Sequence, residues 1–124
     1  MPIYENGRVL VIDDDHATLE ATGALLANWG WDVDARPRLK DADIASLEKT
    51  DMIISDYELA FGETGLEVIK AIRAAHGPIP ALIITGSTMP EIRQKIADAG
   101  FILLHKPVMP VQLRSAILSL MDRA

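Results

Sequence analysis

The sequence predicts an α/β fold in which a doubly wound, five-stranded parallel sheet carries helices on both faces. Two observations predict it. Five short apolar runs alternate with five stretches in which apolar residues recur at helical spacing. The connections between them are short, and a parallel sheet with right-handed crossovers accommodates this alternation. The predicted strands cover residues 9–12, 31–35, 52–54, 81–84 and 101–104.

The first two predicted strands differ in pattern, and the difference indicates their places in the sheet. The first is continuously apolar and stops abruptly at Asp13, as a strand buried on both faces does. A helix over residues 16–29 follows, and Gly30 ends it. The second strand alternates apolar with acidic residues, which is typical of a half-exposed edge strand. Weaker periodicity predicts the second helix over residues 39–49.

The remaining helices have clearer boundaries. The third covers residues 65–77, and the fifth covers residues 110–121. The fourth begins in the segment 88–91, which predicts a capping box on Thr88 with a proline in the first turn, and it ends at Gly100. With the second strand at an edge, the simplest strand order is 2-1-3-4-5. The chain then reverses direction between strands one and three, where ligands bind beside the carboxyl ends of strands.

Composition is typical of one folded domain over residues 1–124, because 49% of the residues are hydrophobic and 24% are charged. The absence of cysteine excludes disulfide frameworks, thiolate zinc sites and cysteine nucleophiles. A net charge of −6 disfavours direct nucleic-acid binding. No apolar run reaches membrane-spanning length, and residues 1–7 lack the features of a signal peptide. We therefore expect a cytoplasmic chain without direct membrane insertion, which a longer protein could still tether to a membrane kinase.

Polar residues follow four of the five predicted strands. They form the segments 13–15, 55–56, 85–87 and 105–107. A single acid after a strand is usually a helix cap, but the strand order brings several acids together. Two carboxylates about 4 Å apart repel each other by about 4 kcal/mol at an effective dielectric constant of 20. The cluster therefore needs a cation, and a set of oxygen ligands favours Mg²⁺. Its predicted ligands are Asp13, Asp14 and Asp56.

The same edge of the sheet carries the groups that phosphoryl transfer to a carboxylate requires. A carboxylate can act as a nucleophile and form an aspartyl phosphate. The transferred group then needs metal, lysine and hydrogen-bond donors to neutralise its charge. We predict Asp56 as the acceptor, Lys106 as the point charge and the Thr85 hydroxyl as a donor.

Four motifs occur in order, at residues 11–14, 53–56, 83–86 and 106–107. Together they make the chain resemble the receiver domain of bacterial two-component response regulators over nearly all of its length. The segments 65–69 and 103–108 are similar to the receivers at the C-terminal end of hybrid sensor histidine kinases. A DNA-binding or catalytic output domain is absent from these 124 residues, so the chain could be part of a longer protein.

The resemblance implies a flavodoxin-like fold and a phosphorelay signalling function in place of an enzymatic one. In that family the acidic pair holds Mg²⁺, directly through Asp14 and often through water from Asp13, and the main-chain carbonyl of Glu58 is a further ligand. Asp56 accepts phosphate from the histidine of a histidine kinase or histidine phosphotransfer protein. The threonine and the lysine of the family then respond to the phosphate, and partner binding switches.

The chain also departs from the family at several positions. Ala60 stands where the family often has proline, and Gly65 comes one residue late, which predicts a longer or more mobile loop. Leu103 occupies the place of an aromatic residue that changes exposure in most members, so switching through an aromatic is in doubt. Glu58 and Ser87 would flank the path of an attacking water, which predicts an altered phosphoryl lifetime.

Two further expectations concern Pro107 and the last two helices. The peptide bond between Lys106 and Pro107 is expected to be cis, because X-Pro bonds tolerate that form. A set of apolar residues near the last two helices could form a partner surface, including that of a homodimer, or could equally be the inner faces of those helices. The set is Ile92, Ile96, Leu103, Leu113 and Ile117.

Several residues are expected to have structural roles only. Asp15 is expected to cap the first helix, since Asp is favoured at that position. His105 is a packed or solvent-facing residue, and Trp29 and Trp31 belong to the core.

Three other functions fit the sequence less well. A degenerate receiver would only dock a partner, although the full set of acids, threonine and lysine disfavours it. A haloacid-dehalogenase-type phosphatase also forms an aspartyl phosphate, but the spacing of Asp13, Asp15 and Ala17 fits that family poorly and leaves Asp56 without a role. Flavin binding is disfavoured because three successive aspartates repel a cofactor phosphate.

Overall fold

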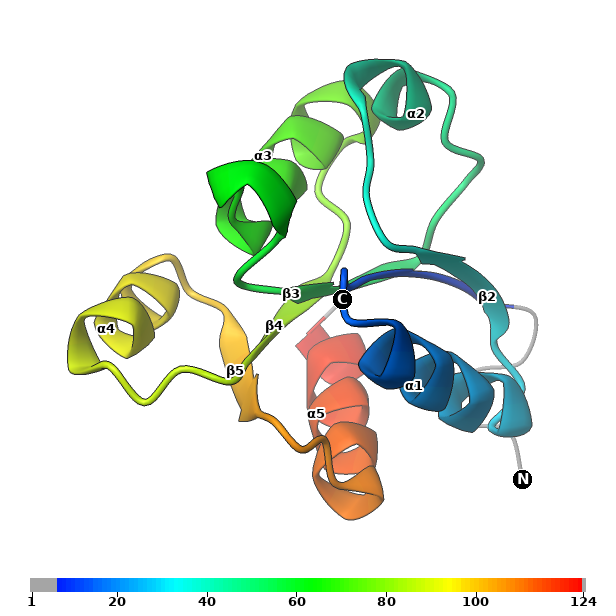
Figure 1. The fold of residues 1–124 in the computed structure, drawn as a ribbon. Coiled ribbons are helices and arrows are strands. Elements are labelled where there is room, and N and C mark those ends of the chain that lie inside the picture. The colour runs from blue at the N-terminus through cyan, green and yellow to red at the C-terminus, as the bar shows by residue number, and fades with distance from the viewer. Residues whose placement is uncertain (1–6, 124) are drawn as a thin grey trace.

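A five-stranded, parallel sheet forms the centre of the protein, in the order β2-β1-β3-β4-β5 (Figure 1). This order confirms the predicted topology. The structure, a computed structural model, describes residues 7–123. β3 and β4 are buried along their whole length, because helices cover both faces of the sheet. The strands are β1 (Arg8–Ile12), β2 (Asp32–Arg36), β3 (Met52–Asp56), β4 (Ala81–Thr85) and β5 (Ile102–His105).

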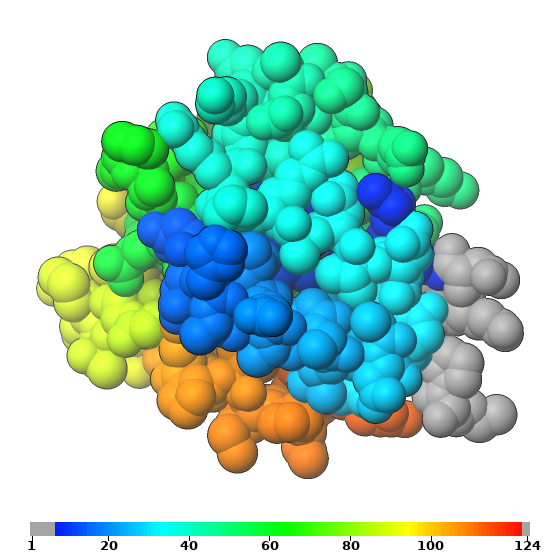
Figure 2. Space-filling view, turned by 45° about the vertical axis from the view of Figure 1, so that its right-hand side comes forward, coloured from blue at the N-terminus to red at the C-terminus, as the bar shows by residue number. Residues whose placement is uncertain are grey.

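Helices cover both faces of this sheet. They are α1 (His16–Asn28), α2 (Asp41–Ala45), α3 (Gly65–His76), α4 (Pro90–Asp98) and α5 (Pro110–Arg123). α1 and α5 pack on one face, and α2, α3 and α4 pack on the other (Figure 1). On the first face α1 also lies beside the β5–α5 connection (Figure 2), where Ala21 and Pro107 line one groove. Within residues 7–123, no helix has both the length and the apolar character that crossing a membrane requires.

The second helix is shorter than predicted. It ends at Ala45, whereas the periodicity predicted a helix over residues 39–49. Ser46 is its C-cap, with φ −100° and ψ 9°, and both its backbone N–H and its hydroxyl donate to the carbonyl oxygen of Ala42. Leu39 and Leu47 are still buried in the core, but they reach it from outside the helix. The apolar spacing therefore identified core residues correctly but overestimated the length of the helix.

The predicted capping box at the start of α4 is wrong. The N-cap is Met89, which makes no side-chain capping hydrogen bond, and the helix begins at Pro90. A residue before proline is restricted to extended conformations, and Met89 has φ −70° and ψ 123°. The N-cap is therefore Met89, one residue after Thr88. The hydroxyl of Ser87 accepts a hydrogen bond from the Met89 N–H instead.

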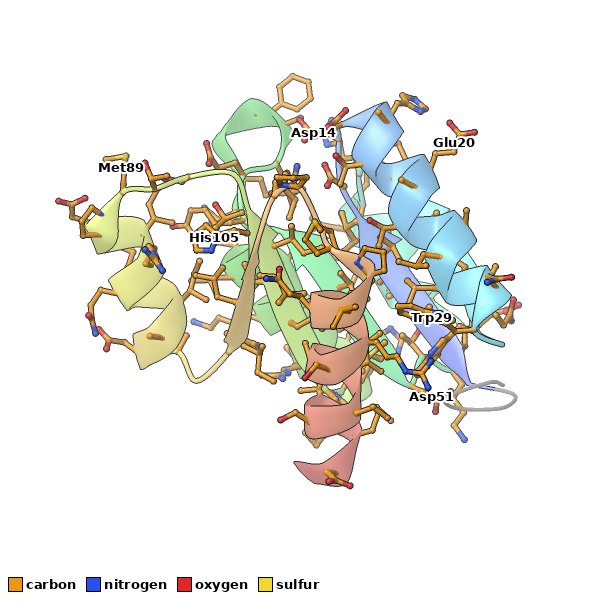
Figure 3. The ribbon with its side chains drawn as sticks, turned by 90° about the horizontal axis from the view of Figure 1, so that it is seen from below. Asp14, Glu20, Trp29, Asp51, Met89 and His105 are labelled. Atoms are coloured by element: carbon orange, nitrogen blue, oxygen red, sulfur yellow. The ribbon has the colours of Figure 1, made fainter. Side chains whose placement is uncertain are left out.

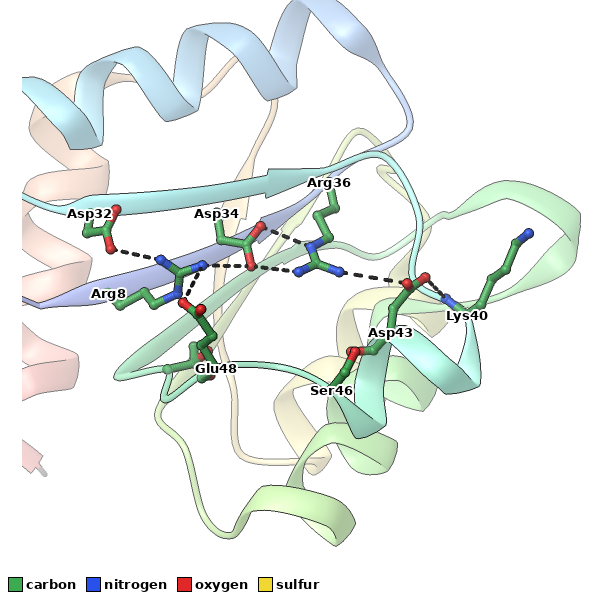
Figure 4. Close-up of polar contacts among 9 residues, drawn as sticks. Arg8, Asp32, Asp34, Arg36, Lys40, Asp43, Ser46 and Glu48 are labelled. Carbon is green, nitrogen blue, oxygen red and sulfur yellow. Dashed lines mark hydrogen bonds and ion pairs between the residues drawn. The ribbon is translucent and has the colours of Figure 1, made fainter.

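The acidic residues of the edge strand are held by arginines (Figure 4). Arg8 of β1 donates to Asp32 at 2.8 Å and to Asp34 at 3.3 Å, and it lies 3.5 Å from Glu48. The Nε of Arg36 lies 2.9 Å from Asp34. The alternating pattern that identified β2 as an edge strand thus reflects ion pairs along one face of β1 and β2, and charged edges resist pairing with other chains.

Candidate functional site

Three carboxylates meet at the carboxyl ends of β1 and β3. Asp13 and Asp14 directly follow β1, and Asp56 is the last residue of β3. One oxygen atom from each lies within 4.8 Å of the other two. Asp13 and Asp56 are buried, whereas Asp14 is exposed at this end of the molecule (Figure 3). The convergence predicted from the strand order is confirmed.

Lys106 bridges the two buried carboxylates. Its Nζ lies 3.0 Å from an oxygen of Asp56 and 3.1 Å from an oxygen of Asp13. The residue follows β5, and its backbone N–H donates to the carbonyl oxygen of Thr85. The Lys106–Pro107 peptide bond is cis, as expected. Three carboxylates beside a single ammonium group retain two negative charges when all are ionised, and this oxygen-rich set fits a hard divalent cation.

Thr85 is fully buried at the end of β4. Its hydroxyl oxygen accepts a hydrogen bond from the Ser87 N–H at 3.0 Å. A hydroxyl that accepts one bond keeps its proton available for donation. The structure thus brings Thr85 to the same edge as the acids, with its oxygen engaged by the β4–α4 loop.

The loop after Asp56 is closed by backbone contacts. The Tyr57 carbonyl accepts from the Gly65 N–H, and the Glu63 carbonyl accepts from the Leu59 N–H. Glu58 forms a β-bridge with Thr64, and its side chain is exposed. A short 3-10 turn, η1 (Ala60–Gly62), forms the tip. The one-residue delay of Gly65 is accommodated in this hairpin-like loop.

Burial dominates the electrostatics of Asp56. It raises the pKa of Asp56 from 3.8 to about 6, and the charge of Asp13 adds to the rise while the hydrogen bond and charge of Lys106 oppose it. For Lys106, burial is the largest influence and lowers the pKa, but the bonds to Asp56 and Asp13 outweigh it and the pKa is raised. Asp56 and Lys106 therefore each hold a proton more tightly in the folded chain than in the unfolded chain.

Stability of the metal-free protein is expected to depend on Asp56 in a defined direction. A carboxyl whose folded pKa is raised stabilises the fold below its ordinary pKa of 3.8 and loses that contribution as pH rises through about 6. Asp56→Asn should therefore raise the free energy of unfolding at pH 7.5 in EDTA, by up to about 3 kcal/mol, because one pKa unit corresponds to about 1.4 kcal/mol. Urea unfolding at several pH values measures this, and the two proteins should converge near pH 4. An Asp56→Asn protein that is less stable than wild type at pH 7.5 would contradict the assignment.

Residues expected to be structural behave as predicted. Asp15 caps α1 by accepting from the Ala17 N–H and from the Thr18 hydroxyl, and the second bond lowers the pKa of Asp15. Trp31 is buried, and Trp29 packs partly buried against the same core. His105 is half-buried on β5.

Burial shows where the apolar set near the last two helices lies. Ile96, Leu113 and Ile117 are fully buried, and Ile92 and Leu103 are partly buried against the core. These residues form the inner faces of α4, β5 and α5. The partner-surface interpretation is therefore excluded for Ile96, Leu113 and Ile117, whose side chains no partner can reach.

Sequence reasoning missed two residues near the site. Phe61 is 84% exposed at the tip of the loop that follows Asp56. The guanidinium carbon of Arg38 lies 4.3 Å from the centre of its ring. A large aromatic residue beside a glycine in a loop was the available signal, but nothing in the sequence places Arg38 against it.

Comparison with known proteins identifies the family of the chain. The family model described as the response regulator receiver domain matches residues 9–118. The chain is 32% identical over 102 residues to the transcriptional regulatory protein ZraR of Salmonella typhimurium, covering 81% of this chain and 23% of that protein. It is also 32% identical over 111 residues to a cyclic di-GMP phosphodiesterase of Thermotoga maritima, covering 88% of this chain and 29% of that protein. The chain thus spans less than a third of either relative.

Solved structures show the same fold. A CheY-like receiver domain protein from Methanospirillum hungatei matches with a TM-score of 0.80 and 24% identity, covering 96% of each chain. The chemotaxis protein CheY4 of Vibrio cholerae matches with a TM-score of 0.77 and 26% identity, covering 93% of this chain and 98% of that one. The flavodoxin-like topology is therefore shared along nearly the whole chain. With four ordered motifs, the acidic cluster and the family match in agreement, the chain belongs to the response regulator receiver domain family of two-component signalling.

Proposed function

We propose that this domain is a Mg²⁺-dependent phosphoacceptor in a phosphorelay, and that Asp56 takes a phosphoryl group from the phosphohistidine of a histidine kinase or histidine phosphotransfer protein. One observation carries the proposal. Asp56 is buried between a second buried carboxylate and the Lys106 ammonium, with Asp14 completing an oxygen cluster open to solvent. A nucleophilic carboxylate, a cation site and a fixed positive charge are the parts that phosphoryl transfer needs.

The reaction balances with the residues present. An oxygen of Asp56 forms the new O–P bond, the P–N bond to the donor histidine breaks, and its electron pair returns to the imidazole ring. Mg²⁺ would be held by Asp13, Asp14, Asp56 and the main-chain carbonyl of Glu58, and it would neutralise charge on the transferring phosphoryl group. Lys106, 3.0 Å from Asp56, lies close enough to pair with a phosphoryl oxygen after transfer.

Thr85 supplies the response to phosphorylation in this proposal. Its hydroxyl proton can be donated to a phosphoryl oxygen, and its oxygen is already bonded to the Ser87 N–H. A movement of Thr85 toward the phosphate would therefore pull on the β4–α4 loop. The neighbouring strand β5 carries Leu103 in place of an aromatic residue. The conformational change would therefore pass through the β4–α4 loop and not through an aromatic side chain. Partner binding would change near α4, β5 and α5.

The broader setting of the domain is also proposed. We place it in the cytoplasm, without direct contact to nucleic acid, as a signalling domain and not an enzyme. The parent chain can be a stand-alone regulator, a transcriptional regulator or a hybrid histidine kinase, and the full gene distinguishes them. A homodimer through the outer surface of the last two helices would have to use exposed residues such as Val111. Sedimentation with and without phosphorylation tests that dimer.

Two alternatives predict different behaviour. A docking-only receiver would bind partners without accepting phosphate. An aspartyl-phosphate phosphatase of the haloacid dehalogenase type would need Asp15 as its second acid, but both oxygens of Asp15 are engaged at the start of α1. The geometry therefore favours the phosphoacceptor.

Intact mass spectrometry after incubation with acetyl phosphate and Mg²⁺ tests the proposal. Wild type is expected to gain one phosphoryl adduct, and the adduct should be absent with EDTA and absent in Asp56→Asn. Circular dichroism establishes that the variant is folded. If folded wild type binds Mg²⁺ but gains no adduct, the docking-only alternative replaces the proposal.

A further inference from the structure

Exposed apolar side chains lie in the loops that follow three of the strands, at the edge of the sheet that carries the candidate site. Among the described residues, five large hydrophobic side chains are exposed: Phe61, Met89, Met109, Val111 and Leu118. The first three lie in the loops after β3, β4 and β5, which are the strands that lead into Asp56, Thr85 and Lys106. Figure 3 shows Met89 at the same end of the molecule as Asp14. Single exposed apolar residues are ordinary, but their gathering around one charged site indicates a contact surface.

Phe61 contributes least of these residues to the stability of the isolated domain. Its side chain is 84% exposed, so it contributes little to the core. Its backbone has φ 62° and ψ 32°, in the left-handed region, which costs a residue with a side chain about 1 kcal/mol. Unfavourable backbone conformations persist where the surrounding structure enforces them, and they concentrate at functional sites. Neither local conformation nor burial explains a phenylalanine here.

The loop presents Phe61 in a fixed way. Backbone bonds between Tyr57 and Gly65 and between Leu59 and Glu63 close the loop, and its tip carries the ring. Arg38, from the connection between β2 and α2, lies against the ring at 4.3 Å in a cation–π contact. The ring is therefore ordered before any partner binds, which lowers the entropy cost of a contact.

We propose that Phe61, supported by Arg38, is an anchor for the protein phosphodonor and contacts an apolar surface beside the donor's phosphohistidine. This inference rests on the proposed phosphoacceptor function. The loop that carries Phe61 starts at the acceptor, because Asp56 is five residues earlier in the chain. A protein that brings phosphohistidine to Asp56 must approach these loops, whereas a small phosphodonor needs only the acidic site. Met89 and Met109 add flexible apolar contacts around the anchor.

Two phosphodonors distinguish an effect on binding of the protein donor from an effect on phosphoryl transfer to Asp56. One is acetyl phosphate. The other is an autophosphorylated, radiolabelled histidine kinase, chosen from the kinases of the source genome as the one that labels wild type fastest. Phe61→Asn removes the ring and keeps a residue that tolerates positive φ. Phe61→Tyr keeps an aromatic ring, and Leu118→Ala shortens an exposed apolar side chain about two turns along α5.

Phe61→Asn should lower the rate of transfer from the kinase about 10-fold or more, in kcat/KM, and leave labelling by acetyl phosphate within about twofold of wild type. Phe61→Tyr and Leu118→Ala should transfer at the wild-type rate. Equal kinase rates in Phe61→Asn and wild type would overturn the anchor. An equal loss with both donors would overturn it as well, because the loop would then serve the chemistry. Wild type labelled by neither donor would instead remove the proposed function.

Discussion

Gly65→Ala is expected to lower the free energy of unfolding by about 3 kcal/mol and to slow phosphorylation of Asp56. A Cβ atom on Gly65 would collide with the carbonyl oxygen of Asp56 and lie 2.9 Å from the hydroxyl oxygen of Ser55. Both neighbours are fixed, because Ser55 donates to the Asp56 carbonyl inside a fully buried strand. The clash can be relieved only by moving the start of α3 or the end of β3.

Thermal and urea unfolding measure the first effect, and we expect the melting temperature to fall by about 10 °C. Gly23→Ala is the matched control, because its Cβ would make an ordinary contact of 3.6 Å with Val33 and alanine favours a helix. That control should be neutral or slightly stabilising. A Gly65→Ala protein as stable as Gly23→Ala would show that β3 and α3 can separate without cost.

Removal of two charges from the acidic cluster is expected to abolish Mg²⁺ binding. In the double variant Asp13→Asn and Asp14→Asn, two of the three clustered carboxylates become neutral, and Mg²⁺ depends strongly on ligand charge. We expect affinity to fall by at least about 100-fold. Isothermal titration calorimetry measures it. Labelling by acetyl phosphate should fall in parallel, because metal neutralises the transferred group.

Asp15→Asn is the matched control for this prediction. Asp15 is the next residue in the chain, but its oxygens cap α1, and asparagine caps helices about as well as aspartate does. Mg²⁺ affinity should therefore stay close to that of wild type. An equal loss of affinity in Asp15→Asn and in the double variant would mean that general acidity, and not this cluster, attracts the cation.

Much of the fold and of the candidate site could be predicted from the sequence. The apolar runs at β1, β3 and β4 identify buried parallel strands. Helices cover both faces of such a strand, so its side chains are apolar on both faces and do not alternate with polar ones. The alternation of apolar and acidic residues in β2 marks an edge strand. The edge fixes the strand order, and the order brings Asp13, Asp14 and Asp56 to one place. These inferences depend on patterns that recur along the chain and on covalent order, both of which are present in the sequence.

Other features depended on atoms far apart in the sequence. The length of α2 was overestimated because Leu39 and Leu47 reach the core from outside the helix, and periodicity records burial without recording backbone conformation. Ile96 and Ile117 were candidates for a partner surface near α4 and α5, but both are fully buried in the structure. Apolar residues on a helix look the same in sequence whether the sheet or a partner covers them.

The sequence alone was enough to predict the order of the strands, the clustered acids and the lysine beside them. The raised pKa of Asp56, the need for glycine at position 65 and the contact between Arg38 and Phe61 became visible only in the folded structure. The first group follows from hydrophobic periodicity and from chain order. The second group arises from burial and from distances across separate elements, which exist only after the sheet and its loops have packed.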